Sequence, residues 1–378
     1  MEETIGFPTE ITNCDKPQSC KSTPCYREIN TAKILVIGLG QLGLPVAKYV
    51  KDRGFDVYGY DISTKALERA EKTAGIKKAI NFSGFDVYII CVSTHRQEDM
   101  FSPQIEGILS IVQDKIAKEA KNGALVSIES TIPKGTSKKV FEMLNHRLHV
   151  AHAPHRWYAL EEKEHGVNQL RVVGGVCDCC LRAAMQFYDG AVISTIEEEQ
   201  QTEASTPKSA SIEATEITTS GNGNGNGNGQ GLNNLTNIPS TKNTSLGIPM
   251  HPVPEIEIAE LTKIIENAHR YLQIAFAEDL YLYCQANNIN FAELRDSLNT
   301  KWNVNVLEPR EGIGGHCLPK DTKMFLNSSR SIKSRILEAA IQTDETYRTH
   351  RGTKEITQHE YAASANYLTK TMCQNVRS

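Results

Sequence analysis

The stretch Lys33-Ile34-Leu35-Val36-Ile37-Gly38-Leu39-Gly40-Gln41-Leu42-Gly43 decides the fold of this chain. A short apolar run that ends in glycine is typical of a buried parallel strand. The pattern G-x-G-x-x-G follows at once, and a helical pattern continues to Asp52. A strand, a glycine turn and a helix in this order predict the first unit of a doubly wound sheet, with a dinucleotide site at the turn.

Each glycine of this turn has its own role in such a site. Gly38 permits the tight turn, Gly40 lets a pyrophosphate approach the backbone, and Gly43 allows close packing of helix on strand. The phosphate would lie at the helix N-terminus, where free N–H groups and the helix dipole favour an anion. The predicted cofactor-binding residues of the turn are Gly38, Gly40, Gln41, Leu42 and Gly43.

Asp61 ends the next predicted strand, about 20 residues after the turn. A carboxylate at this point would hydrogen-bond the ribose hydroxyls and would repel a 2′-phosphate. We therefore predict NAD rather than NADP as the cofactor. A glycine-rich turn of purely structural use is the competing interpretation.

Strand and helix patterns alternate through the first half of the chain, which predicts an α/β domain with a mostly parallel, doubly wound sheet. Further helices are expected over 63–72 and 104–121. The other expected strands span 56–61, 86–92, 124–128, 149–152, 170–173 and 191–193.

Composition narrows the class of protein. The 378 residues suffice for two domains, and the formal net charge of −4 gives no reason to expect nucleic acid or an anionic membrane as partner. No apolar run approaches the roughly 20 residues that span a bilayer. The polar N-terminal segment has no apolar core typical of a secretory signal. These features predict a cytoplasmic protein.

Ten cysteines are many for such a protein. None of them forms paired C-x-x-C units with zinc spacing. The run Cys177-Asp178-Cys179-Cys180 begins a predicted helix and could bind a metal. Packing of small, half-buried thiols at a helix start is the favoured interpretation, so no metal site is predicted.

The second half of the chain changes character twice. Residues 196–252 are rich in Glu, Ser, Thr, Asn and Gly, and predict a disordered linker because they cannot bury enough apolar surface to offset ordering. A long amphipathic helix is expected from Pro254 to Ala286, and shorter ones over 291–298 and 332–347. The predicted divisions are a leader at 1–30, a nucleotide-binding domain at 31–195, the linker at 196–252, a helical domain at 253–350 and a tail at 351–378.

Two motifs in the helical domain carry chemistry. Gly314-Gly315-His316-Cys317-Leu318-Pro319-Lys320-Asp321 places a thiol, a lysine and a carboxylate behind two glycines that let a substrate approach. In the long helix, Lys263 and Asn267 lie four residues apart and therefore on one face. Cys317 in such a loop is interpreted as a nucleophile rather than a buried structural thiol.

With these motifs, the chain resembles the UDP-glucose/GDP-mannose dehydrogenase family of nucleotide-sugar 6-dehydrogenases. The matching segments are 33–47, the turn Glu129-Ser130-Thr131-Ile132-Pro133-Lys134-Gly135-Thr136, 260–280 and 309–326. The run Pro154-His155-Arg156 is most similar to the UDP-N-acetylmannosamine branch of the family.

The resemblance implies oxidation of a sugar C6 alcohol to a carboxylate with two NAD. Cys317 would hold a thiohemiacetal and then a thioester, Lys263 and Asn267 would stabilise the oxyanion, and Asp321 would hold a water. It further implies Thr94 and Thr131 near the cofactor. Substrate contacts would come from His155, Arg156, Lys263, Gly314 and Gly315, and a homodimer would form through the central helix.

Two departures from the family stand out. His155 occupies the position of a glutamate implicated in thioester hydrolysis; it could act as a base or pack, and Glu161 or Glu162 could substitute. The family also normally has a third, nucleotide-binding domain, for which little chain remains after Tyr347. The sugar, the need for that domain and the role of the linker are left open.

Two other functions stay possible on the sequence alone. One is a two-electron dehydrogenase of the 6-phosphogluconate or 3-hydroxyacid type, which also uses a K-x-x-x-N helix but needs no thiol. The other is a non-catalytic, shortened NAD-binding regulator.

Overall fold

The computed structural model describes residues 32–94, 104–156, 166–190, 245–315, 317–328 and 334–352. Eight strands form one sheet in the order β3-β2-β1-β4-β5-β6-β7-β8. Six of them are parallel, while β7 runs antiparallel to β6 and β8 runs parallel to β7. The strands are β1 (Lys33–Ile37), β2 (Asp56–Tyr60), β3 (Lys77–Lys78), β4 (Val87–Ile90), β5 (Leu125–Ile128), β6 (His149–His152), β7 (Arg171–Gly175) and β8 (Met250–Val253).

Helices cover both faces of the sheet because its strands are apolar on both sides. Ile34 and Val36 pack into one core with α1 and α6, and Leu35 and Ile37 pack into the other with α3, η3 and α5. The predicted doubly wound fold is confirmed. The covering helices are α1 (Gly43–Asp52), α2 (Thr64–Ala74), α3 (Glu106–Ile111), the π-helical η3 (Val112–Ile116), α4 (Ala117–Glu119), α5 (Thr136–Met143) and α6 (Asp178–Tyr188).

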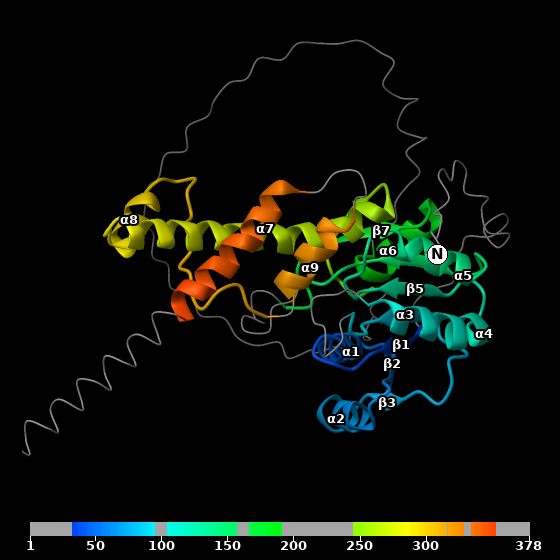
Figure 1. Cartoon of the computed structure of the whole chain (residues 1–378). Helices are drawn as coiled ribbons and strands as arrows, with labels where there is room; N and C mark the ends of the chain where they lie inside the picture. Colours follow the sequence, from blue (N-terminus) through cyan, green and yellow to red (C-terminus); the bar gives the residue numbers. More distant parts are fainter. Residues whose placement is uncertain are drawn as a thin grey trace, which may run out of the picture.

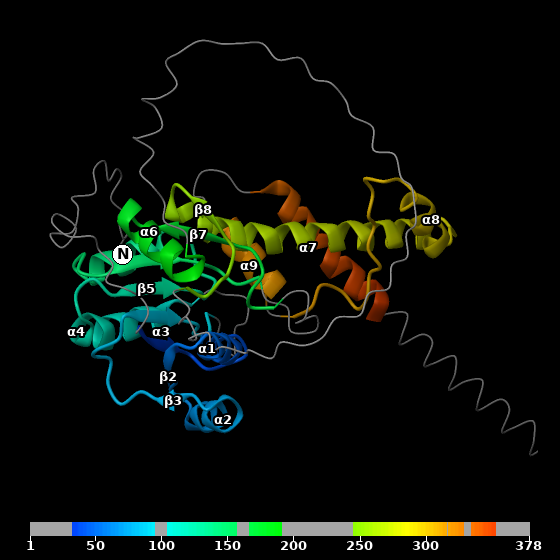
Figure 2. The same ribbon diagram turned by 180° about the vertical axis from the view of Figure 1, so that it is seen from behind.

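A helical part follows, built along one long helix. Helix α7 (Ile256–Ala286) extends away from the sheet domain, with α8 (Phe291–Leu298) at its far end and α9 (Cys317–Leu326) beside it (Figure 1). A last helix over 335–352 crosses α7 at an angle (Figure 2) and contacts it, because the Tyr271 hydroxyl of α7 donates to Asp344. Tyr271 and Ala275 of α7 share a small core with Ile313 and Ala340. None of the helices in the described segments is long and apolar enough to cross a membrane.

The structure moves two boundaries expected from sequence. Residues 245–253 belong to the sheet domain, although the linker was predicted to run through residue 252. Strand β8 is short, carries Pro252 and lies at the sheet edge, where proline is tolerated. The last helix runs to 352, past the predicted boundary at 350. The leader, the expected strand at 191–193, the linker up to 244 and the tail from 353 lie outside the described residues.

The crevice beside β1 is where this topology binds ligands. β1 lies between β2 and β4 in the sheet. The connection that leaves β1 leads to β2, and the connection that leaves β4 leads to β5, so the two run in opposite directions across the sheet. In doubly wound sheets, ligands bind outside the carboxyl ends of the strands at such a switch point. The glycine turn follows β1 and Thr94 follows β4, which places both at this edge.

Candidate active site

The glycine turn connects β1 to α1, and each glycine in it meets a different constraint. Gly38 has a φ of +86°, and a Cβ there would lie 2.8 Å from the carbonyl oxygen of Cys91. A Cβ on Gly43 would lie 1.7 Å from the carbonyl oxygen of Gly38, whereas a Cβ on Gly40 would meet no atom within 4 Å. The first and third glycines are therefore needed for the fold, and the second leaves the backbone open to a ligand.

The start of α1 suits an anion. Leu42 is its N-cap and provides no side-chain cap, and the first turn of α1 has no acidic residue. Gln41, just before it, is exposed. Unpaired N–H groups and the positive end of the helix dipole favour a pyrophosphate here, so the turn fits a dinucleotide.

Asp61, the residue that follows β2, forms a hydrogen bond with the backbone of the glycine turn. Its Oδ2 accepts a hydrogen bond from the Leu39 backbone N–H at 2.7 Å, and its Oδ1 accepts one from the Ser63 N–H at 2.8 Å. Arg69 of α2 donates to the Leu39 carbonyl oxygen at 2.9 Å. Both carboxylate oxygens keep a lone pair for a ribose hydroxyl, so the role predicted from sequence is compatible with these bonds.

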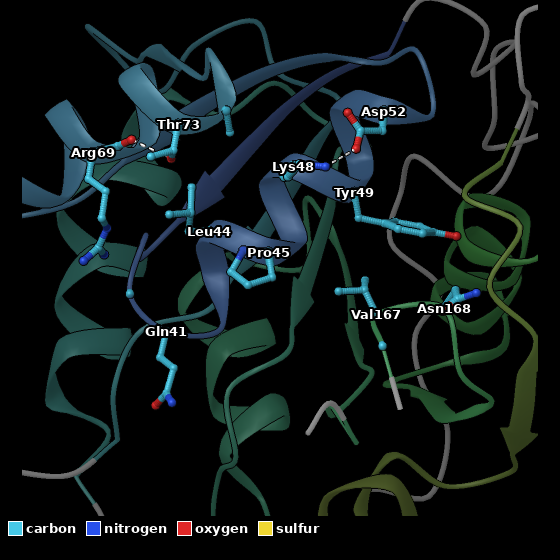
Figure 3. A pocket seen from close by; sticks show the side chains of 13 residues that line it. Gln41, Leu44, Pro45, Lys48, Tyr49, Asp52, Arg69, Thr73, Val167 and Asn168 are labelled. Atoms are coloured by element: carbon cyan, nitrogen blue, oxygen red, sulfur yellow. Dashed lines mark hydrogen bonds and ion pairs between the residues drawn. The ribbon is translucent and has the colours of Figure 1, made fainter. Parts of the chain in front are cut away.

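A cavity of about 610 Å³ opens on the outer flank of the turn. Figure 3 shows Arg69 on one side of it and Tyr49 with Asn168 on the other, with α1 between them. Gly40 and Gln41 line the cavity, but none of the predicted catalytic residues does. The predicted catalytic residues lie elsewhere along this edge of the sheet, where their side-chain contacts define the site.

Helix α9 lies over the carboxyl end of β4, next to the glycine turn. The Nζ of Lys320 is 3.5 Å from the Oγ1 of Thr94, although 226 positions separate the two residues. Both are buried, at 4% and 5% exposure. Cys91, which Gly38 touches, lies three residues before Thr94. This contact brings the cysteine motif to the predicted cofactor edge.

The carboxylate of Asp321 joins α7 to α9. Its Oδ2 accepts a hydrogen bond from the Nδ2 of Asn267 at 2.5 Å, and its Oδ1 is 2.6 Å from the Nζ of Lys320. Lys263 lies one helical turn before Asn267 on α7, and among the described residues its ammonium has no ion-pair or hydrogen-bond partner. The structure thus groups Asn267 with Asp321 and leaves a cation available beside them.

Cys317 is exposed and is the first residue of α9, so the nucleophile expected in a loop lies at the start of a helix. The surrounding protein removes enough water to raise the pKa of its thiol, and the Asp321 carboxylate raises it further. The ammonium groups of Lys320 and Lys263 act in the opposite direction, since both lower this pKa. The thiol is therefore close enough to Lys263, Lys320 and Asp321 to sense all three charges.

A buried carboxylate fixes where α7 meets the sheet domain. Glu260 is fully buried, and its two oxygens accept backbone hydrogen bonds from Gly135 at 2.6 Å and from Ser137 at 2.8 Å, at the N-terminus of α5. Burial raises the pKa of Glu260, and these donors oppose that rise. Because Glu260, Lys263 and Asn267 follow each other at three- and four-residue steps, this anchor places the other two on the face of α7 that meets α9.

The predicted substrate residue His155 lies inside the protein rather than on the cleft surface. It is 6% exposed, and its Nε2 contacts the carboxylate of Glu129, which also receives the hydroxyl of Tyr188 and lies 3.3 Å from Arg171. Burial and the Arg171 charge lower the pKa of His155 to about 4. Burial opposes ionisation of Glu129, but His155 and Arg171 outweigh it and lower its pKa to about 2.

The other predicted residues have varied surroundings. Arg156 forms an ion pair with Glu266 of α7 and donates to the Leu170 carbonyl oxygen at 3.1 Å, so it links the two parts of the chain. Thr131 is half-buried just after β5. Gly314 and Gly315 are exposed, and Gly315 has a φ of +80°. His316, Glu161 and Glu162 lie outside the described residues.

Sequence reasoning assigned no role to several residues that the structure places in or beneath the site. Lys320 belongs to the cysteine motif, and its position next to Asp321 is the sequence feature that could have indicated its ion pair. Glu260 could have been found because it lies three residues before Lys263 on a helix. Glu129, Arg171 and Tyr188 come from three separate elements, and no local pattern joins them.

Comparison with known proteins identifies the parts of the chain. Residues 68–192 match the NAD binding domain of the UDP-glucose/GDP-mannose dehydrogenase family, and residues 257–346 match its central domain. The first match begins after the glycine turn and includes Thr94, the second includes Lys263 and Cys317, and the first supports the predicted cofactor, NAD.

Similar proteins include two UDP-N-acetyl-D-mannosamine dehydrogenases. The one from Methanococcus maripaludis is 26% identical over 330 residues, covering 82% of this chain and 64% of that protein. The one from Campylobacter jejuni is 26% identical over 347 residues, covering 83% and 71%. This chain thus spans slightly less than two thirds of the length of the first of them.

A solved structure of a UDP-D-ManNAc dehydrogenase from Pyrococcus horikoshii aligns with a TM-score of 0.64 and 24% identity. The alignment covers 88% of this chain and 72% of that one. At this identity the likeness supports the fold.

Proposed function

Because the chain belongs to the UDP-glucose/GDP-mannose dehydrogenase family, we propose that it oxidises the C6 hydroxyl of a UDP-sugar to a carboxylate in two steps, with Cys317 as nucleophile. The observation that carries this proposal is the contact of Lys320 with Thr94, because it sets the cysteine motif at the edge of the NAD binding domain. NAD would accept one hydride in each oxidation, so two molecules of NAD would be reduced for each sugar.

The residues around Cys317 suit the covalent half of this chemistry. The first oxidation removes a hydride from C6 and the hydroxyl proton, and leaves an aldehyde. The Cys317 thiolate adds to its carbonyl carbon, and the resulting oxyanion takes a proton to give a thiohemiacetal. The Lys263 ammonium and the Asn267 amide are the donors on the chain that would stabilise that oxyanion.

The second half returns the enzyme to its starting state. Loss of a second hydride and the hydroxyl proton turns the thiohemiacetal into a thioester. Water then attacks the thioester carbon, the C–S bond breaks, and Cys317 leaves as a thiolate. Asp321 is the carboxylate nearest this step; its oxygens already bind Asn267 and Lys320, and each keeps a lone pair that would orient the water.

We assign His155 a positioning role rather than that of the hydrolytic base. Its pKa of about 4 makes it a weak proton acceptor at neutral pH, and its Nε2 contacts Glu129. Its neighbour Arg156 is engaged by Glu266 of α7. Together these two residues would hold the segment Pro154-His155-Arg156 between the buried Glu129 and the helix that carries Lys263.

UDP-N-acetylmannosamine is the sugar nucleotide we propose first. The Pro154-His155-Arg156 run and the names of the similar proteins support it. A two-electron dehydrogenase is not favoured, because a single hydride transfer leaves the thiol of Cys317 without a use. The family match also speaks against a non-catalytic regulator. We propose the cytoplasm as the compartment, since the reaction consumes NAD.

Counting NADH per sugar tests the proposal. We expect a panel of UDP- and GDP-sugars to yield two NADH per molecule of the true substrate, with a uronic acid as product. In Cys317→Ala, the second oxidation has no thiohemiacetal to act on, so the yield should fall to one or none. A yield of one NADH by the unaltered chain would contradict the covalent mechanism.

A homodimer through α7 is the second part of the proposal. Ile258, Ile265, Phe276 and Tyr283 of this helix are between 39% and 59% exposed. They follow each other at steps of 7, 11 and 7 residues. At about 100° per residue these steps bring all four within about 20° of one line, so they form an apolar stripe on one face of α7.

A further inference from the structure

Three thiols and one imidazole meet at the edge of the sheet opposite the cofactor turn. His149 begins β6, so it lies at the amino end of a parallel strand, whereas the glycine turn and Thr94 follow carboxyl ends. Cys177 is the N-cap of α6, and Cys179 and Cys180 lie in its first turn. This cluster is therefore separate from the site around Cys317.

The ligand atoms of His149, Cys179 and Cys180 lie close enough together to hold one ion, and the sulfur of Cys177 lies beside the other two sulfurs. The Sγ of Cys177 lies 3.1 Å from that of Cys179 and 3.3 Å from that of Cys180. A ring nitrogen of His149 and the sulfurs of Cys179 and Cys180 all lie within 4.8 Å of one another. Sulfurs bound to tetrahedral zinc at about 2.3 Å lie ~3.8 Å apart. The thiols would thus need to spread by about 0.5 to 0.7 Å, which rotation of the half-buried Cys177 and Cys179 can supply.

His149 provides independent evidence that the cluster holds something. The residue is only 3% exposed, and its Nδ1 is buried with no hydrogen-bond partner among the described residues. A ring nitrogen that is buried without a hydrogen-bond partner loses its hydration, and this lowers the free energy of unfolding. Packing alone gives no interaction that offsets the loss. Thiol packing alone, the interpretation favoured from the sequence, accounts for the cysteines but leaves this nitrogen unexplained.

We propose that Cys177, Cys179, Cys180 and His149 form a four-coordinate structural Zn²⁺ site. Thiolates and imidazole are the ligands that zinc prefers, and four protein ligands close the coordination sphere as in structural sites. Each thiol that becomes a ligand releases its proton to solvent, and the imidazole binds as the neutral ring. The metal ties the start of α6 to the first residue of β6.

The position at the N-terminus of α6 suits the charge of such a site. Three thiolates and Zn²⁺ carry a net charge of −1, and the free N–H groups and dipole of this 11-residue helix favour a negative centre. Asp178 is the one carboxylate in the motif, and it is exposed to water rather than turned into the cluster. A dithiol redox pair at Cys177 and Cys180 would need neither Cys179 nor His149.

Metal analysis of the full chain tests the site. Protein produced with zinc in the medium and purified without chelators or a histidine tag should contain one zinc per chain by mass spectrometry of the metal. Exchange for Co²⁺ should give the visible bands of a tetrahedral ion and sulfur-to-cobalt charge-transfer absorption from three thiolates. In Cys179→Ser, which alters a half-buried position, the charge-transfer absorption should fall by about one third and zinc should be retained less tightly.

Cys317→Ser is the matched control, because it removes an exposed cysteine outside the cluster and should leave zinc content and the cobalt spectrum unchanged. His149→Gln should remove the imidazole but keep three thiolate bands. The wild-type cobalt spectrum reports the ligands even if a variant fails to fold. Absence of stoichiometric metal, a disulfide between two of the three cysteines in the freshly isolated protein, or loss of zinc in Cys317→Ser would each overturn the proposal.

Discussion

At the scale of single residues, a cysteine nucleophile needs its thiolate, and the charges around Cys317 act in opposite directions. Removal of water and the Asp321 carboxylate raise the pKa of the thiol, while Lys320 and Lys263 lower it. The same carboxylate also pairs with Lys320, and so partly cancels a cation that would otherwise favour the thiolate. A substrate whose pyrophosphate or sugar reorders these groups would change the reactivity of Cys317.

This balance predicts the pH dependence of Cys317 alkylation. The rate of iodoacetamide labelling should rise with pH about a midpoint above the ordinary cysteine value of about 8.5. Asp321→Asn removes a negative neighbour and releases Lys320, so the midpoint should move to lower pH; Lys320→Met should move it to higher pH. Peptide mass spectrometry of the labelled cysteine gives the rates.

Asp279→Asn is the control for the alkylation experiment, because this exposed acid of α7 is not among the charges that act on the thiol. Its midpoint should equal that of the unaltered chain. A midpoint for Asp321→Asn that stays in place or moves to higher pH would show that the carboxylate does not control the thiol.

Functional residues can be predicted from the sequence where they belong to one local motif. Cys317 and Asp321 lie four residues apart in one motif, and Lys263 and Asn267 on one helical face, so spacing alone groups each pair. His155 shows the limit. His155 is buried in contact with Glu129, and Glu129 also contacts Arg171 and Tyr188. These partners come from distant parts of the sequence, so no pattern near position 155 predicts them.

At the scale of elements, the turn between β1 and α1 separates a glycine needed for binding from one needed for folding. A Cβ at Gly40 would enter open space, whereas one at Gly43 would collide with the Gly38 carbonyl oxygen. Gly40→Ala should therefore keep the thermal midpoint of the protein and weaken NAD binding, because the methyl group occupies the path of the pyrophosphate. Calorimetric titration with NAD measures the loss.

Gly43→Ala is the matched partner of that variant. Relief of the clash must move α1 away from β1, which should cost about 1–3 kcal/mol of the free energy of unfolding. Thermal unfolding followed by circular dichroism gives the comparison. The assignment of roles fails if Gly40→Ala binds NAD as the unaltered chain does, or if Gly43→Ala is as stable as Gly40→Ala.

The elements also show why boundaries are harder to predict than patterns. The run from Ile34 to Ile37 is apolar and buried on both faces, so its identity as a strand is plain from sequence. Strand β8 has only four residues, of which His251 and Pro252 are exposed, and it adds to the sheet edge beside β7. Its strand character comes from the partner strand rather than from its own composition.

At the scale of the whole molecule, two deeply buried histidines couple stability to pH. Burial lowers the pKa of His152 and of His155 to about 4. Between pH 6.5 and 4 the unfolded chain takes up protons at both positions and the folded chain does not, so stability falls as pH falls. Above pH 6.5 both rings are neutral in both states and the effect is absent. Each residue should cost on the order of 3 kcal/mol by pH 4.

Urea unfolding at a series of pH values from 7.5 to about 4.5 measures this coupling. His155→Gln can still donate to Glu129 and cannot be protonated, so it should flatten the decline by about one proton. His269→Gln, at an exposed position of α7, should leave the slope unchanged. A decline of equal steepness in His155→Gln would mean that other groups cause the acid sensitivity.

The final prediction concerns the assembly of two chains along α7. The apolar stripe defined by Ile258, Ile265, Phe276 and Tyr283 lies on a helix that projects from the sheet domain (Figure 1), so a second copy can approach it. Burial of a phenylalanine side chain stabilises an interface by about 1.5–3 kcal/mol. Phe276→Glu would instead place a charge in the apolar contact, and should raise the dissociation constant of the dimer at least tenfold.

Analytical ultracentrifugation over a range of concentrations measures that constant. Asp279→Lys changes an exposed residue of the same helix, about 60° around the axis from Phe276 at about 100° per residue, and serves as the control for a charge change beside the stripe. The unaltered chain and this control should sediment as dimers at concentrations where Phe276→Glu is a monomer. Because Asn267 lies on α7 and Asp321 on α9 of the same chain, the monomer should keep the hydrogen bond between them. Sedimentation of the unaltered chain as a monomer at all concentrations would remove the stripe as an interface.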